Sequence, residues 1–205
     1  MDRKSSEDPE MLQVLADKID SIPAIPEVTD RVLRALEEDV SYEALERIIR
    51  TDPSLTGRLL QLANRRYYGH EREVTSLKHA VQLLGFNTLQ SVAVAHGMDN
   101  EYSAPEVSAF PRDAFWTYSL ATGVAGEIIA EELGLDGETK GQVFSAGHLH
   151  AVGKTIIDQY LHREFVKIVR LVNEENRSMF DAEESVLGIT HCEIGGAILD
   201  EWNLP

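Results

Sequence analysis

Apolar residues recur at helical spacing along almost the whole of this 205-residue chain. The longest such run begins near Pro111 and continues to Gly134, with apolar or small side chains three or four positions apart. We find no run that alternates with a period of two, which is the spacing of a half-buried strand. The sequence therefore predicts an all-α protein, organised as two packed helical lobes.

Two stretches interrupt the helical pattern and mark the expected domain boundaries. Pro23 and Pro26 break the chain after a first amphipathic pattern, so residues 1–20 are expected to form an N-terminal helix or extension. A polar, proline-containing stretch follows Asp99 and is the expected boundary between the lobes. The main domain is thus expected to cover residues 21–205, with one lobe at about 21–99 and the other at about 110–205.

Local signals predict where several helices begin and end. Ser41 and Asp52 are expected N-caps, and Pro53 suits the first turn behind Asp52. Gly85 is expected to end one helix before another starts at Asn87. Small residues predict that the helix at 111–134 contacts another helix closely, and these are Ala121, Gly123, Ala125 and Gly126.

The net charge of −16, from 19 Lys and Arg against 35 Asp and Glu, limits the classes of partner. Nucleic acids are bound through clustered basic residues, so an acidic chain is not expected to bind them. One local basic patch is an exception to this acidic character. It is either a surface that contacts phosphates or a solvated helix end, and it comprises Arg58, Arg65, Arg66, Arg72, Tyr67 and Tyr68.

Three absences in the sequence favour a soluble protein in the cytoplasm. No apolar run approaches the roughly 18 residues that a membrane helix needs, and no signal peptide is recognised at the start. The single cysteine, Cys192, cannot close an internal disulfide, which fits a reducing compartment. We therefore expect no membrane contact.

If the chain performs chemistry, it is expected at a histidine-rich turn, His148-Leu149-His150-Ala151-Val152-Gly153-Lys154. Imidazoles and carboxylates are the groups that hold a water-activating divalent metal. His148 and His150 point about 200° apart on a helix, so they cannot share one metal unless the helix ends between them. Ala151 supplies no oxygen ligand. Asp158 and His162 share a helix face, which is either a ligand pair or a solvated face.

Several motifs in a fixed order resemble those of HDOD domains. Ile22-Pro23-Ala24-Ile25-Pro26-Glu27-Val28 is similar to the family's opening, and IRTDPSLTGRLLQLAN at 49–64 resembles its next block. SLKHAVQLLG at 76–85 and FSAGHLHAVGK at 144–154 continue the match, so that the resemblance covers about residues 20–205. The residues that carry it are Pro23, Pro26, Asp52, Pro53, Leu59, Asn64, Tyr68, Gly69, Gly85, Trp116 and Gly153.

The resemblance implies an all-helical domain related to the HD and HD-GYP phosphohydrolases. It also implies a bacterial signal-transduction or regulatory module that has lost metal-dependent catalysis and acts by binding signalling proteins. We therefore expect no cofactor and no catalytic residue, while the oligomeric state stays open. Relatives normally continue with further helices, so a C-terminally incomplete domain is expected.

The resemblance also locates a degenerate metal site. Tyr118 stands where many relatives have a histidine, and Ala151 stands where the family's enzymes have an aspartate. The candidate metal ligands that remain are His150 and His191, fewer than the three that a catalytic metal needs. The residues expected around this relic pocket are Tyr118, His148, His150, Lys154 and His191.

Two other functions remain open from the sequence. A diverged metal-dependent phosphohydrolase or phosphodiesterase would need replacement ligands for the missing carboxylate. A sensor for an anionic nucleotide would use the ammonium group of Lys154 in the relic pocket, although a lysine exposed at a helix start explains that residue as well.

Overall fold

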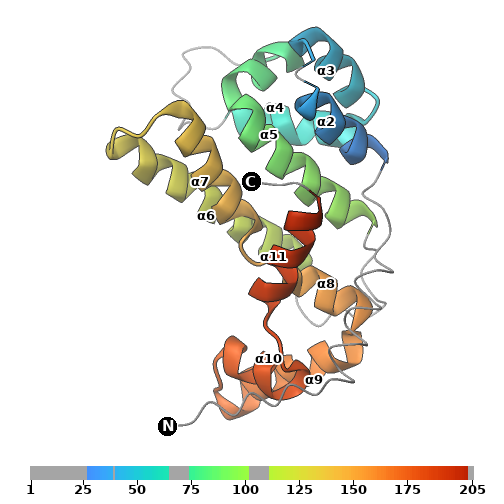
Figure 1. The fold of residues 1–205 in the computed structure, drawn as a ribbon, viewed down its shortest axis with the longest axis vertical. Coiled ribbons are helices and arrows are strands. Elements are labelled where there is room, and N and C mark those ends of the chain that lie inside the picture. The colour runs from blue at the N-terminus through green and yellow to red at the C-terminus, as the bar shows by residue number, and fades with distance from the viewer. Residues whose placement is uncertain (1–26, 39, 65–73, 102–110, 203–205) are drawn as a thin grey trace. The chain divides into compact units, whose positions relative to one another are not determined.

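Helices make up the secondary structure of this computed structural model, which describes residues 27–38, 40–64, 74–101 and 111–202 (Figure 1). None of these residues lies in a strand, and the all-α prediction is confirmed. The expected helix at 1–20 and the motif residues Pro23, Pro26, Tyr68 and Gly69 lie outside the described residues. The helices are α2 (Glu27–Glu37), α3 (Tyr42–Ile49), α4 (Pro53–Ala63), α5 (Leu77–Glu101), α6 (Arg112–Glu132), α7 (Gly137–Leu149), α8 (Gly153–Tyr160), α9 (His162–Glu175), α10 (Met179–Leu187) and α11 (His191–Glu201).

Side-chain caps explain where α3 and α4 begin. Ser41 Oγ accepts a hydrogen bond of 3.3 Å from the amide three residues further on. Asp52 Oδ1 accepts from the amides of Ser54 at 2.9 Å and Leu55 at 3.0 Å. These amides belong to the first helical turn, which has no earlier carbonyl to receive them. Both predicted N-caps are confirmed.

Helix α5 is two helices joined at Gly85. The backbone there has φ 74° and ψ 169°, a conformation that is almost confined to glycine. The prediction that one helix ends at Gly85 and another follows is therefore confirmed, although the two are assigned as one element. The kink changes the direction of the chain without a loop between the two halves.

The chain divides into two compact units, which we describe separately. The α2–α7 unit comprises Ile25–Glu101 and Trp116–Leu149, and the α8–α11 unit comprises Met1–Ala24, Tyr102–Phe115 and His150–Pro205. This grouping differs from the lobes expected from sequence, since α6 beyond its first turn and α7 join the N-terminal helices. The chain does change unit within the polar stretch after Asp99, at Glu101 and Tyr102, but it returns at Trp116, so that α7 contributes to the same core as α5.

The core of the α2–α7 unit is built from the apolar faces of α2 to α5, with Phe144 added from α7. Phe144 is fully buried. Asn64 joins the end of α4 to Val74, because its side chain accepts a hydrogen bond from the Val74 amide at 2.7 Å and donates one to the Val74 carbonyl at 2.8 Å. The largest buried members of this core include Leu45, Ile49, Leu55, Leu59, Leu62 and Leu89.

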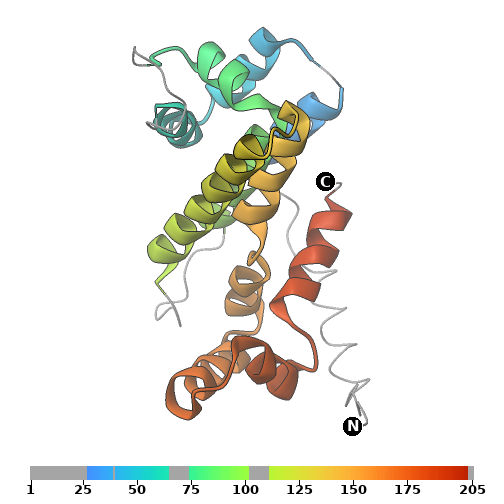
Figure 2. The ribbon, with the colours of Figure 1, turned by 90° about the vertical axis from the view of Figure 1, so that its left-hand side faces the viewer.

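Helices α6 and α7 lie side by side because glycines remove the side chains between them (Figure 2). A Cβ atom at Gly123 would lie 2.8 Å from the Phe144 carbonyl oxygen, and one at Gly147 would lie 2.9 Å from the Gly123 Cα. The predicted close helix contact is confirmed for Gly123 and also for Gly126, where a Cβ atom would lie 2.9 Å from Val143 Cγ1. Ala121 and Ala125, which belonged to the same prediction, are instead exposed.

In the α8–α11 unit, α8 packs against both α9 and α11, and α9 packs against α10. The buried apolar side chains come from all four helices, with Ile157, Phe165 and Ile168 among the most completely enclosed. Thr190 starts α11 with a reciprocal capping box: its hydroxyl accepts from the Glu193 amide, and the Glu193 carboxylate accepts from the Thr190 amide. Within the described ranges, no helix is both long and apolar enough to span a bilayer.

Candidate functional site

The histidine-rich turn is the connection between α7 and α8, and it separates its two histidines. His148 is buried in the last turn of α7, with its ring centroid 5.5 Å from that of Phe144 and 6.3 Å from that of Trp116. His150 follows the end of α7 and is exposed, whereas Ala151 is only 2% exposed. The position at which the family resemblance leads one to expect a carboxylate is thus occupied by an enclosed methyl group.

Gly153 allows the first turn of α8 to contact the start of α11. A Cβ atom at Gly153 would lie 2.0 Å from the His191 carbonyl oxygen and 2.9 Å from the Gly195 amide nitrogen. Both distances are too short for any side chain, and both involve backbone atoms that cannot rotate away. The glycine that the family motif places here therefore brings His191 next to the turn.

His191 is held by a carboxylate that the sequence interpretation did not identify. The Nδ1 atom of His191 lies 2.6 Å and 2.8 Å from the two carboxylate oxygens of Glu183, and the His191 amide donates to the same carboxylate at 3.0 Å. Glu183 is fully buried and His191 is 4% exposed. The ring of Phe180 stacks on the imidazole at a centroid distance of 5.2 Å. This geometry orients the ring and assigns the carboxylate to Nδ1.

The five residues expected around the relic pocket divide between the two units. Tyr118 and His148 belong to the α2–α7 unit, in which Tyr118 is 63% exposed. His150, Lys154 and His191 belong to the α8–α11 unit, in which Lys154 lies half-buried in the first turn of α8. The pocket as a whole therefore stays a prediction.

The residues at the turn do not fit a divalent metal. In the part of the chain that the structure describes, no group of three or more His, Cys, Asp and Glu side chains is close enough to hold one. Ala151 offers no ligand atom, and both oxygens of Glu183 face His191.

A second buried carboxylate lies on α8. Asp158 is fully buried, with Oδ2 at 3.2 Å from Arg112 Nη2 and Oδ1 at 2.9 Å from His162 Nδ1. The Asp158–His162 spacing left a ligand pair or a solvated face as alternatives. The solvated face is wrong for Asp158, since the carboxylate is enclosed and paired with a guanidinium, whereas the ligand pair stays a prediction.

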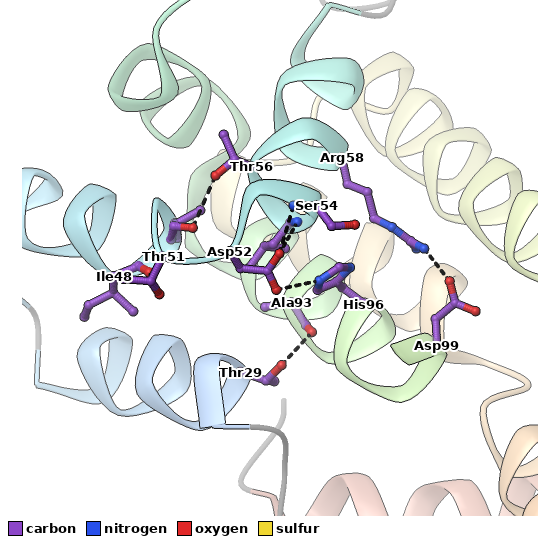
Figure 3. A network of polar contacts seen from close by, with 12 residues as sticks. Thr29, Ile48, Thr51, Asp52, Ser54, Thr56, Arg58, Ala93, His96 and Asp99 are labelled. Carbon is purple, nitrogen blue, oxygen red and sulfur yellow. Dashed lines mark hydrogen bonds and ion pairs between the residues drawn. The ribbon is translucent and has the colours of Figure 1, made fainter. Parts of the chain in front are cut away.

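A third polar network joins α2, α4 and α5 (Figure 3). Asp52, the N-cap of α4, has its Oδ2 atom 2.8 Å from Nε2 of His96, which is 2% exposed. Arg58 pairs with Asp99 on the same two helices, and Thr29 Oγ1 donates to the Ala93 carbonyl at 3.1 Å. The aspartate of the family's Asp-Pro block therefore connects a helix start to a buried imidazole.

The charge of Asp52 is stabilised by these contacts. Burial raises the pKa of the Asp52 carboxyl. Hydrogen bonds from the Leu55 amide, His96 and the Ser54 amide lower it by more than burial raises it, so the pKa lies below its ordinary value. The carboxylate is therefore ionised under physiological conditions, and it accepts from two helix N–H groups that carry positive partial charge.

Sequence reasoning missed Glu183, His96 and Arg112 as members of polar networks. Glu183 lies three positions after Phe180 and four before Leu187, so it shares their helix face, and His96 lies three positions after the buried Ala93. A charged or polar residue on an otherwise apolar helix face predicts that this residue is buried and has a polar partner. The partner itself is not readable, because the sequence does not give tertiary contacts.

Comparison with known proteins identifies relatives over nearly all of the chain. A crystal structure of an HDOD domain protein of unknown function from Geobacter sulfurreducens has a TM-score of 0.73 and 29% identity, covering 97% of this chain and 67% of that one. A protein from Shewanella amazonensis SB2B, provisionally named a phosphohydrolase, has a TM-score of 0.73 and 26% identity, covering 93% of this chain and 67% of that one.

An uncharacterized protein of Treponema pallidum (strain Nichols) is 26% identical over 192 residues, which is 93% of this chain. The chain spans 37% of the length of that relative. The family model described as HDOD domain matches residues 22–205, which agrees with the motifs from Asp52 to Gly153 and with the helical fold. The chain therefore belongs to the HDOD domain family.

Proposed function

We propose that this chain is a signal-transduction or regulatory module that acts by binding a partner protein and does not hydrolyse phosphoesters. The observation that carries the proposal is Ala151, a methyl group 2% exposed beside the exposed His150. A bridging carboxylate is what a two-metal phosphohydrolase site needs to hold its ions. The turn resembles the corresponding motif of the HD phosphohydrolases but has alanine at the position of the acidic ligand.

The environment of Tyr118 also supports a binding role. A neutral phenol is a poor ligand for the divalent ions used in phosphoester hydrolysis. Tyr118 is 63% exposed, so its ring presents a large amphipathic surface to solvent. Such aromatic side chains are common in protein interfaces.

A cytoplasmic location is part of the proposal. The single Cys192 is exposed and free, a state that suits a reducing compartment.

One observation favours a diverged metal-dependent hydrolase as the second candidate. Metal-binding histidines commonly donate one ring N–H to a carboxylate, which directs the other nitrogen towards the ion. His191 has this arrangement through Nδ1 and Glu183. In this alternative, Nε2 of His191 would be a ligand, together with His150 and groups that the described residues do not supply.

Metal content and turnover distinguish the two candidates. Protein purified without added metal should contain no stoichiometric Mn, Fe, Ni or Zn by plasma mass spectrometry, and it should not hydrolyse cyclic dinucleotides or p-nitrophenyl phosphate when those ions are added. Stoichiometric metal together with turnover would overturn the proposal, provided that His150→Ala and His191→Ala remove both.

Replacement of Ala151 tests the residue that carries the proposal. Ala151→Asp restores the carboxylate and Ala151→Asn adds the same volume without its charge. Metal retention by the Asp variant, but not by the Asn variant, would show that the missing carboxylate accounts for the lost ion. If the Asp variant retained no more metal than wild type and the Asn variant, the absence of metal could not be assigned to Ala151.

A further inference from the structure

Four large apolar side chains lie exposed where α6 turns into α7. Ile128, Ile129, Leu133 and Leu135 have exposed fractions of 37%, 60%, 71% and 39%. We call these four residues the tip surface. Single exposed apolar residues are ordinary on a protein surface, whereas apolar residues gathered into one patch are typical of an interaction site.

The turn that presents the tip surface is held by a complete helix C-cap. Gly134 has φ 71°, and its amide donates to the Glu131 carbonyl at 2.8 Å. The Leu135 amide donates to the Ala130 carbonyl at 3.0 Å. These are the two hydrogen bonds of a Schellman motif, which ends α6 with a defined backbone geometry.

The start of α7 is capped as well. Asp136 Oδ1 accepts from the Thr139 amide at 2.9 Å, and Asp136 Oδ2 accepts from the Thr139 hydroxyl at 2.8 Å. The two caps meet within three residues, so the turn holds one conformation. Exposure of the tip surface is thus a property of an ordered turn, and an ordered surface loses little conformational entropy on binding.

The charges around the tip surface have one sign. Every charged residue from position 127 to position 138 is acidic, and these are Glu127, Glu131, Glu132, Asp136 and Glu138. The first basic residue that follows in the sequence is Lys140, whose Nζ lies 3.9 Å from Glu131, so five acidic residues stand against one basic residue between positions 127 and 140. A partner that covers the apolar residues must therefore approach through a negative potential.

We propose that the tip surface docks an amphipathic helix of a partner protein whose apolar face is flanked by Lys and Arg. The apolar residues supply the buried contact, and the acidic residues on either side select a cationic partner. A second copy of this chain would bring two acidic tips together, and an anionic membrane would repel the same charges. The inference rests on the proposed function, because it names the surface through which that binding occurs.

A designed peptide of defined chemistry tests the docking surface. The probe is a fluorescein-labelled amphipathic helix of about five turns, ~18 residues, with Leu on one face and Lys on the other. Its matched control carries Glu in place of Lys. Fluorescence anisotropy should show binding of the Lys peptide that weakens with added salt, and no binding of the Glu peptide.

Variants of the chain locate the binding. The double variant Ile129→Asn with Leu133→Asn should weaken binding of the Lys peptide by about tenfold or more, because it removes the two most exposed side chains of the tip surface. Val166→Asn on α9 is the matched control, since Val166 is 38% exposed and apolar but lies outside the tip. Unchanged helical circular dichroism would show that both variants remain folded.

Several outcomes would overturn the inference. Absence of Lys-peptide binding, equal binding by the tip variant, or equal binding of both peptides would each do so. A wild-type dimer in light scattering that the tip variant abolishes would assign the surface to a second copy. Binding to phosphatidylglycerol vesicles that the tip variant abolishes would assign it to lipid.

The proposed function fails on a different result, namely metal-dependent turnover. The two failures can therefore be told apart: loss of peptide binding without turnover contradicts only the docking surface, whereas turnover contradicts the regulatory role whatever the peptide does.

Discussion

Glu183 binds two groups of one residue, the backbone amide and the ring Nδ1 of His191, at 3.0 Å and 2.6 Å. The carboxylate is fully buried, so its solvation has been replaced by these contacts. The pair connects α10 to the first turn of α11. It therefore orients the histidine of the candidate site and also positions the helix that carries it.

Removal of the Glu183 charge should destabilise the fold. We expect Glu183→Gln to lower the free energy of unfolding by about 1–3 kcal/mol, since an amide cannot accept both hydrogen bonds in the same way. Glu183→Ala should cost roughly 3–5 kcal/mol, because it leaves the buried imidazole without its partner. Urea denaturation measures both. The neighbouring Glu184→Gln is the control, since Glu184 is exposed, and an equal effect of the two Gln variants would contradict the assignment.

The Asp52–His96 contact should make stability depend on pH in the acidic range. The pKa of Asp52 is lowered in the folded protein, so its contribution is present above the ordinary aspartate pKa of about 3.9 and is lost as the pH falls through the lower, folded-state pKa. Asp52→Asn keeps a capping side chain and removes the charge. The difference in unfolding free energy between wild type and this variant should shrink towards zero as the pH is lowered below about 4.

Circular dichroism with urea, at a series of pH values, measures this difference. A gap between wild type and Asp52→Asn that stays constant down to the acidic limit would show that the carboxylate charge does not stabilise the fold. Asp52→Ala should be less stable than Asp52→Asn at every pH, by about 1 kcal/mol, because it also loses the N-cap.

Two glycines of the α8–α11 unit should respond in opposite ways to alanine. Gly153→Ala places a Cβ atom 2.0 Å from the His191 carbonyl oxygen and should destabilise the protein by about 3 kcal/mol or more. Gly196→Ala is the control within α11, where a Cβ atom meets nothing within 4 Å. It should raise stability by up to about 1 kcal/mol, because alanine favours the helix. Thermal unfolding gives the order, and a tolerated Gly153→Ala would disprove the close contact.

The kink in α5 predicts a similar contrast in the other unit. At Gly85 the φ of 74° is unfavourable for any residue with a Cβ atom, although there is space for one. Gly85→Ala should therefore cost about 1–3 kcal/mol through backbone strain alone. Gly57→Ala, in the interior of α4 with nothing within 4 Å, should stabilise by up to about 1 kcal/mol. Comparable unfolding midpoints for the two variants would rule out strain at the kink.

Helix positions were predictable from sequence because their signals are local. The caps at Ser41 and Asp52 and the break at Gly85 each depend on a few neighbouring residues, and all three are observed. The grouping of helices was not predictable in the same way. The sequence places α7 after a long polar stretch, yet Phe144 joins the core of the N-terminal helices.

The candidate site shows the same limit. The sequence locates the turn and its missing carboxylate at Ala151, because the motif carries both. It does not show that Glu183, eight residues before His191, is the partner of that histidine, since this contact depends on how α10 and α11 pack. Nor does it show that His148 contacts Trp116, because that contact depends on how α6 and α7 pack.

The contact at Gly153 is a steric contact between the backbones of two helices and involves no metal ligand. The glycine is required because two backbones meet there, and this requirement holds whether or not position 151 carries an acid. Sequences can therefore exchange the acid while steric selection keeps the glycine and the residues around it. A well-matched glycine in such a turn then indicates how two helices pack, whereas the residue two positions before it bears on whether the carboxylate ligand is present.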